Sequence, residues 1–151
     1  MKLFWEDAAD PSLALPAYQS RGASGADIRA NFTPAQRSKG VTLRPMERGI
    51  IPTGLRLEIP PGFEVQVRAR SGLAARHGIS LVNGVGTIDS DYRGPLGILL
   101  INLGQEPFLI SHGDRIAQLV VAPVVQARFQ MAGALSGTRR GAGGFGSTGK
   151  N

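Results

Sequence analysis

The stretch NGVGTIDSDYRG, residues 83–94, holds the side chains best suited to chemistry on a polar ligand. Asp89 and Asp91 are two residues apart, so in a strand their carboxylates would face the same side. Two neighbouring carboxylates can bind a divalent ion, or one of them can activate water as a base. Asn83 and the glycines after it predict a hairpin whose backbone approaches a flat ligand, and Tyr92 offers a ring to a sugar or base. The alternative is a polar hairpin with a solvated face.

A second candidate is RARSGLA, where a strand is expected to meet the start of a helix. Arg70 supplies a guanidinium, Ser71 a hydroxyl and Gly72 a backbone amide, and such groups together suit an anion. The alternative is a helix capped by Ser71 beside a surface arginine.

Two shorter stretches carry isolated polar candidates. In SGADIRA a glycine permits close backbone approach, and Asp27 opens a strand. In GDRIAQLVV, Asp114 and Arg115 are candidates for an ion pair, and Gln118 for a ligand contact. Taken alone, an acidic residue in a turn and an ordinary strand start explain the two stretches better than a site does.

The C-terminus reads RRGAGGFGSTGK and then Asn151. Two glycines five apart followed by Lys150 fit a phosphate-binding loop, but that loop requires Ser or Thr next and a helix after it. We therefore do not expect a phosphate-loop nucleotide triphosphatase. The amides and Arg140 still suit phosphate oxygens, and Phe145 suits stacking on a base. The alternative is a disordered glycine-rich terminus.

Composition limits the partners and cofactors. The 151 residues carry 17 basic and 11 acidic side chains, for a net charge of +6, and only three of the basic residues are lysines. The arginines are scattered, and a guanidinium grips phosphate with two bonds, so charge alone fits either nucleic acid or a small polyphosphate. With no cysteine and two histidines, a thiol nucleophile is excluded and a histidine-rich metal site is disfavoured. A bound metal should be a hard ion such as Mg²⁺.

The chain shows no targeting or membrane signal. Its N-terminus lacks the apolar core of a signal peptide, and the longest apolar runs, 98–101 and 119–125, are too short to cross a bilayer. We expect a cytoplasmic protein without a membrane partner.

Period-two alternation of apolar and polar residues dominates the chain, and no stretch shows a sustained helical period. Residues 55–59 and 63–69 alternate as half-buried strands, joined by a turn at PPG. Residues 96–102 and 115–124 predict more deeply buried strands, and 71–77 is the one plausible short helix. With 21 glycines and 10 prolines marking turns, the pattern predicts an all-β barrel or jelly roll in a single domain, 1–151. From about residue 133 a mobile tail is expected.

Each candidate is modest alone, but their order is specific. SGAD, RSGLA, NGVGTIDSDYRG, GDRIAQLVV and RGAGGFGSTG closely resemble the five motifs of the trimeric dUTPases, over about residues 20–149. The resemblance implies a jelly-roll-like β-barrel assembled as a homotrimer, with active sites that each use motifs from all three chains. The tail would cross to a neighbour and close over the nucleotide, so it needs no helix of its own.

The resemblance also implies a reaction, dUTP plus water giving dUMP and pyrophosphate with Mg²⁺. This would keep uracil out of DNA and supply dUMP for thymidylate synthesis. By similarity, Asp89 deprotonates the water that attacks the α-phosphorus, and Asp27 contacts the water shell of a metal held mainly by the substrate phosphates. The substrate-binding residues implied are Arg70, Ser71, Gly72, Asn83, Gly86, Tyr92, Gln118, Arg140, Phe145, Gly146, Ser147 and Thr148.

The implied contacts divide by the parts of the nucleotide. The Asn83 amide and the backbone of residues 84–86 would match uracil, Tyr92 would lie against deoxyribose, and Phe145 would stack on the base. The other residues of the set would bind the phosphates. Family members often carry an acidic residue shortly before the first-motif Asp, whereas this chain has Ala23 and Ser24 there. The resemblance therefore does not say which residues complete the outer shell of the metal.

Two rival functions share this scaffold. A dCTP deaminase uses a glutamate where this chain has Asp89, and residues 83–94 contain no glutamate. A non-enzymatic nucleic-acid-binding or regulatory trimer would not need Asp89 or the complete glycine-rich tail. The sequence therefore favours the hydrolase, without nucleic acid as a partner.

Overall fold

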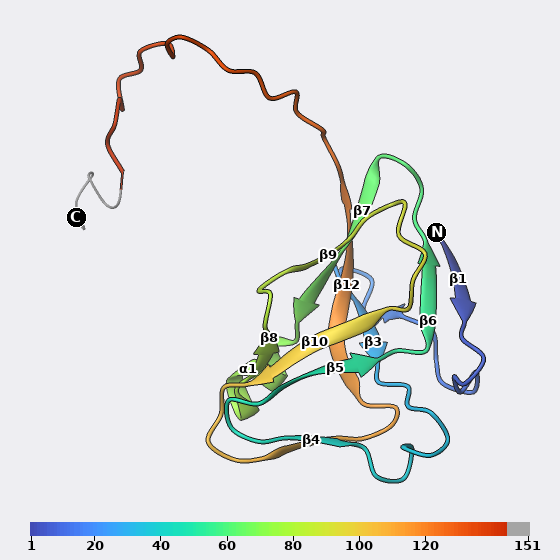
Figure 1. Ribbon diagram of the computed structural model, residues 1–151. Helices are drawn as coiled ribbons and strands as arrows, with labels where there is room; N and C mark the ends of the chain where they lie inside the picture. Colours follow the sequence, from blue (N-terminus) through green and yellow to red (C-terminus); the bar gives the residue numbers. More distant parts are fainter. Residues whose placement is uncertain (145–151) are drawn as a thin grey trace.

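The computed structural model describes residues 1–144, which form a mostly β structure with one short helix (Figure 1). The strands are β1 (Lys2–Trp5), β2 (Ala17–Tyr18), β3 (Ala26–Arg29), β4 (Val41–Leu43), β5 (Arg48–Pro52), β6 (Leu55–Glu58), β7 (Phe63–Ala69), β8 (Ile79–Leu81), β9 (Gly86–Ile88), β10 (Gly97–Asn102), β11 (Phe108–Ile110) and β12 (Arg115–Pro123), and the helix is α1 (Ser71–His77). The two strands predicted by alternation, the two predicted as more deeply buried strands and the helix are confirmed, with boundaries within one residue.

The strands pair into four antiparallel sheets. The largest has the order β2-β3-β12-β7-β9, a second has the order β5-β10-β8, and two pairs, β1-β6 and β11-β4, complete the set. These strands and sheets confirm the predicted all-β class. Within the described residues the ladders do not close into one continuous barrel, so the predicted barrel or jelly roll is not confirmed.

The core lies between the sheets and is built by the predicted alternation. On β7, Val65 and Val67 are buried while Arg68 is exposed, because successive side chains of a strand point to opposite faces. Phe32, Ile51 and Ile98 are fully buried in the same cluster. Burial of each such side chain contributes about 1.5–3 kcal/mol, so the core holds the sheets in fixed positions.

Turn and cap positions follow the chemistry of their residues, with one exception. Gly62 has φ +84 in the predicted PPG turn, and Gly78 closes α1 in the left-handed conformation with φ +69. The prediction that Ser71 caps α1 is wrong. Arg70 occupies the N-cap position without a side-chain cap bond, so the helix begins one residue earlier than that prediction required.

The predicted hairpin at 83–94 is also wrong. β8 pairs with β10, whereas β9 pairs with β7, so residues 82–85 connect two different sheets. Asp89 and Asp91 lie in a turn after β9, closed by a bond from the Tyr92 N–H to the Asp89 carbonyl, and not in a strand. Alternation could not reveal this, because the pairing partners of β8 and β9 are far away in sequence.

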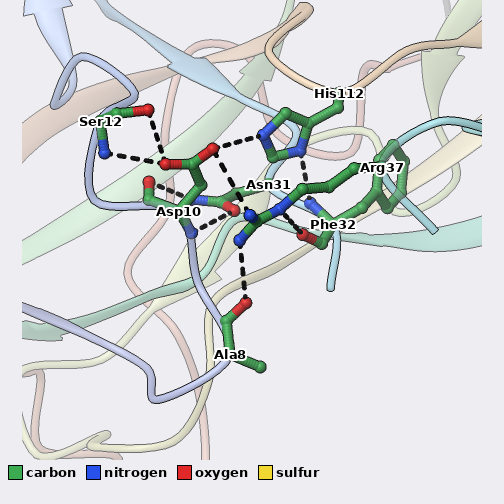
Figure 2. A network of polar contacts seen from close by, with 7 residues as sticks. All are labelled: Ala8, Asp10, Ser12, Asn31, Phe32, Arg37 and His112. Carbon is green, nitrogen blue, oxygen red and sulfur yellow. Dashed lines mark hydrogen bonds and ion pairs between the residues drawn. The ribbon is translucent and has the colours of Figure 1, made fainter. Parts of the chain in front are cut away.

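A polar network ties three loops together beside the sheets (Figure 2). The Asn31 amide and the Asp10 backbone exchange two hydrogen bonds, 2.9 and 3.1 Å long. His112 Nδ1 accepts a bond from the Phe32 N–H at 3.1 Å, so the neutral ring carries its proton on Nε2 and donates to Asp10 Oδ2 at 3.3 Å. Hydrogen bonds from the side chain and backbone of Ser12, helped by His112 and Arg37, lower the pKa of Asp10 from 3.8 to about 2.

Beyond β12 the chain leaves the sheets. In Figure 1 the segment after residue 123 runs away from the strands as an extended chain, and residues 125–142 are exposed. Within residues 1–144, no helix is long and apolar enough to span a membrane.

Candidate active site

Asp27 is the centre of the strongest polar cluster outside the loop network. It lies on β3 directly opposite Gln118 of β12, and its side chain is 3% exposed. Gln118 Nε2 donates to Asp27 Oδ1 at 3.0 Å, and Arg115 Nη1 donates to Oδ2 at 3.0 Å. Gly25 allows this arrangement, because a Cβ there would lie 3.0 Å from the Cβ of Gln118. The close neighbour of this glycine is thus the Gln118 side chain, and the predicted close approach of its backbone to a ligand stays a prediction.

The proposed pairing of Asp114 with Arg115 is not what the structure shows. Arg115 turns to Asp27, while Asp114 Oδ2 accepts a bond from the Ser111 N–H at 2.7 Å. An irregularity in the β3–β12 register between Arg115 and Ala117 accompanies this turn. A bulge of this kind redirects a side chain and leaves no mark in the hydrophobic pattern, so Arg115 was missed as a member of the cluster.

Arg70, Ser71 and Gly72 lie next to this cluster, at the junction of β7 and α1. Arg70 Nη1 donates to the Arg115 carbonyl at 3.0 Å, and Arg70 Nε lies 3.6 Å from Asp27 Oδ1. The structure thus brings together predicted site residues from three separate motifs. Arg29, Arg70 and Arg115 border one cavity of about 300 Å³ with Asp114 as its acidic residue, which gives this region a net positive lining.

Asn83 and Gly86 line a smaller cavity of about 90 Å³ between β7, β8, β9 and β10. A Cβ on Gly86 would lie 3.1 Å from the Val67 Cβ and 3.3 Å from Asn83 Nδ2, so glycine keeps this space open. The remaining walls are largely aliphatic, with Leu81 and Leu99 among them. A flat ligand with polar edges suits such a slot, since its faces meet apolar groups and its edges meet an amide.

Asp89 and Asp91 border a larger open cavity of about 610 Å³, together with Glu64, Ser90 and Gln126. Asp89 is exposed to this space and lies one residue beyond the end of β9. The Asn83 cavity and Asp89 therefore flank the same three-residue strand. A carboxylate in this position is accessible to water.

Tyr92 is half-exposed and its hydroxyl donates to the Pro95 carbonyl at 3.0 Å. Its ring lies over Gly94, where no side chain could fit. The hydroxyl bond restricts the orientation of the ring, and the residue stays 46% exposed.

The two halves of the candidate site lie far apart within one chain. Asp27 is on β3 and Asp89 follows β9, and β12 and β7 separate these strands in the sheet. Across the sheet, Asp27 and Asp89 are three strand spacings apart, each of about 4.8 Å. Along the strands they are four residues apart, from the row of Arg68 to the row of Glu64, with a rise of about 3.3 Å per residue. Together these two components give a separation of about 20 Å. One chain therefore does not place the arginine cluster and Asp89 on the same phosphate group.

The described tail residues do not join either half. Arg140 Nε donates to the Gly143 carbonyl at 2.7 Å, within its own turn. The predicted site residues Phe145, Gly146, Ser147 and Thr148 lie outside the described residues.

The donor set around the candidate site is sparse in metal ligands. Residues 1–144 contain no group of three His, Cys, Asp or Glu side chains arranged to hold an ion. Asp27 already accepts a hydrogen bond on each carboxylate oxygen. These residues fit an ion that arrives with, and is held mainly by, an anionic ligand.

Comparison with known proteins gives a consistent result. A family model described as dUTPase matches residues 12–149. A protein of Roseobacter denitrificans named deoxyuridine 5'-triphosphate nucleotidohydrolase is 61% identical over 149 residues, covering 99% of this chain and 95% of that protein. The protein of the same name from Dinoroseobacter shibae is 59% identical over 145 residues, covering 96% and 94%.

Solved structures show the same fold at lower identity. A mutant dUTPase of Staphylococcus bacteriophage 80alpha with dUpNHpp superposes with a TM-score of 0.81 at 24% identity and covers 98% of each chain. A mutant dUTPase from phage phi11 of S. aureus, described with a structural Mg(II) ion, superposes with a TM-score of 0.71 at 22% identity, covering 91% of this chain and 100% of that one.

Proposed function

The chain belongs to the dUTPase family of hydrolases, and from that membership we propose that it hydrolyses dUTP to dUMP and pyrophosphate. The relatives that share its length carry the name of this activity. The same reaction would remove dUTP before it enters DNA and supply dUMP for thymidylate synthesis.

Family membership carries the proposed reaction, and the separation of the site into two incomplete halves carries the proposal that chains share it. One half offers arginines for phosphate and the other a slot with a neighbouring carboxylate, about 20 Å apart by strand geometry. A homotrimer would complete the site by bringing the Asp89 half of one chain to the Arg70 half of another. Exposed apolar side chains that an assembly would cover support this, including Ile50 and Phe129, at 71% and 94% exposure.

In the mechanism, Asp89 is the general base. Its exposed carboxylate beside the Asn83 slot would hold a water molecule and accept its proton as the water attacks the α-phosphorus. Arg70, Ser71, Gly72 and Gln118 would hold the phosphates in line for that attack, with Arg140, Gly146, Ser147 and Thr148 adding contacts from the tail of a neighbouring chain.

A bound Mg²⁺ would offset the charge that grows on the phosphates. It would be held mainly by substrate, because the described carboxylates form no cage of their own. Asp27 would contribute only through water, since its carboxylate is buried and hydrogen-bonded on both oxygens.

The Asn83 slot gives the specificity for uracil. The Asn83 amide and the backbone near Gly86 would pair with the edge of uracil, and cytosine would leave some of these groups unpaired. Loss of such bonds in a buried site can change rates by about 10⁴–10⁵. The close approach of Gly86 to the Val67 side chain would leave little room for the methyl group of thymine. Tyr92, held by its bond to Pro95, would lie against deoxyribose and exclude a 2′-hydroxyl, and Phe145 would stack on the base.

We further propose that the sheets follow a jelly-roll course in one domain, 1–151, with residues 133–151 as a lid that closes over the nucleotide. A cytoplasmic location without nucleic-acid or membrane partners suits a small nucleotide as substrate.

The deciding experiment measures pyrophosphate release from dUTP, dCTP, dTTP, UTP and dATP by the purified protein with Mg²⁺. Light scattering of the same protein gives the mass of its assembly. We expect turnover of dUTP alone by a trimer. Ammonia release from dCTP would place the protein with the deaminases instead, and a fully active monomer would contradict the shared site.

A further inference from the structure

Two arginines compete for one buried carboxylate in the Asp27 cluster. Arg70 and Arg115 both approach Asp27, so two guanidinium groups share a single negative charge and the cluster is net positive. Gln118, the remaining hydrogen-bond donor to Asp27, is neutral. The distribution of the two arginines around Asp27 therefore decides which of them keeps its charge available for a ligand.

The distances show an unequal division. Arg115 Nη1 lies 3.0 Å from Asp27 Oδ2 in a direct hydrogen bond, while Arg70 Nε stays 3.6 Å from Oδ1, beyond hydrogen-bond range. Oδ1 is already taken by Gln118 at 3.0 Å. Asp27 is thus paired with Arg115 and only weakly with Arg70.

Arg115 also positions Arg70 through its main chain, a contact that any residue at this position would make. Its backbone carbonyl accepts the bond from Arg70 Nη1 at 3.0 Å, which anchors one arm of the guanidinium and turns the rest toward the cavity of about 300 Å³. Arg70 has a side-chain exposure of 25%, whereas Asp27 is 3% exposed. Among residues 1–144, Arg70 makes no other side-chain hydrogen bond, so its remaining donors are not taken up by the described part of the chain.

We propose that Arg115 is a positioning residue that occupies Asp27 and so keeps Arg70 free to bind the phosphates of the substrate. This rests on the proposed function for the identity of the substrate, but the anion-binding role of Arg70 does not require catalysis. Without the Arg115 side chain, the buried Asp27 charge would lose its closest cation. Arg70 is the nearest replacement, and moving onto Asp27 would neutralise it and draw it away from the ligand.

This role differs from a direct contact of Arg115 with substrate. If Arg115 acts by occupying Asp27, its loss matters only while Asp27 is charged. If Arg115 binds phosphate itself, its loss matters equally whether or not Asp27 is present. A double-mutant cycle separates these possibilities, because coupling appears only when one residue acts through the other.

The test measures binding of inorganic tripolyphosphate by calorimetry, and dUTP kinetics, in four full-length proteins: the unaltered chain, Arg115→Gln, Asp27→Asn and the double variant. We expect Arg115→Gln to weaken tripolyphosphate binding and raise KM for dUTP by about 10- to 100-fold, the range for losing a hydrogen bond to a charged group. In the Asp27→Asn background the same change should alter binding by less than about threefold. Arg115→Lys should restore much of the affinity by returning a cation to Asp27.

Arg56→Gln is the matched control. Arg56 is a strand arginine whose guanidinium lies 3.4 Å from one carboxylate, that of Glu6, away from the cavity. Arg56→Gln removes one positive charge, as Arg115→Gln does, and should leave tripolyphosphate binding unchanged. Thermal unfolding of every variant shows which of them fold, and Arg115→Lys keeps the test open if Arg115→Gln does not.

Equal losses in both Asp27 backgrounds would overturn the proposal, as would an unaltered chain that does not bind tripolyphosphate. If the unaltered chain fails to hydrolyse dUTP, the proposed function fails, while the tripolyphosphate cycle still decides the role of Arg115.

Discussion

Gln118 and Asp27 face each other across β12 and β3, joined by a hydrogen bond of 3.0 Å from Gln118 Nε2 to Asp27 Oδ1. Two distant stretches of sequence that each looked ordinary alone thereby form one cluster. Arg115, on the same strand as Gln118, and Arg70, at the junction of β7 and α1, complete that cluster.

The absence of a side chain at Gly25 leaves the space in which Gln118 reaches Asp27. In Gly25→Ala the new methyl would lie 3.0 Å from the Gln118 Cβ and 3.3 Å from its Cδ, so the Gln118 side chain must move. We expect a rise in KM for dUTP and destabilisation of about 1–3 kcal/mol, typical of overpacking in a fitted position. Steady-state kinetics and urea unfolding measure both effects. Gly22→Ala, with open space at that position, is the control.

Replacement of Asp89 isolates the base. Asp89→Asn keeps the shape of the residue beside the 610 Å³ cavity but cannot accept a proton from water. We expect kcat to fall by about 10²–10⁴, the usual contribution of a general base, while dUTP still binds. Turnover near that of the unaltered chain would remove Asp89 from its role. Asp91→Asn, on the same cavity, serves as the comparison and should retain more activity.

Removal of the tail separates catalysis from assembly. A chain that ends before Arg139 loses Arg140 and all the tail residues implied in nucleotide binding, but keeps every strand of the fold. We expect a trimer by size-exclusion chromatography with strongly reduced kcat/KM. A monomer after this truncation would mean that the tail holds the chains together.

The loop network of Figure 2 predicts an acid-dependent loss of stability. The pKa of Asp10 is lowered from 3.8 to about 2, so folding favours its charged form. Its stabilisation is fully present above about pH 4 and is lost as the pH falls from there toward 2. We expect Asp10→Asn to have a lower free energy of unfolding than the unaltered chain at pH 7. The difference in the free energy of unfolding between the two proteins should become smaller by pH 2.5. Urea unfolding across this range provides the measurement, and an undiminished difference at low pH would contradict it.

Local pattern predicted much of this fold. Alternation located β6 and β7, and apolar runs located β10 and β12, because both patterns depend only on neighbouring residues along a strand. The residues PPG predicted a turn, and the structure has Gly62 there with φ +84. The order of five motifs identified the family, since each motif is a short run readable without any contact between them.

Tertiary structure decided the rest, because it depends on partners distant in sequence. Alternation could not show that β8 and β9 join different sheets, nor that Arg115 turns at a bulge to reach Asp27. It also could not show that β12 and β7 lie between Asp27 on β3 and the strand β9 that Asp89 follows. The sequence by itself determined which side chains are available for the chemistry, whereas strand order and register determined which of them meet, since both are set by long-range packing of the core.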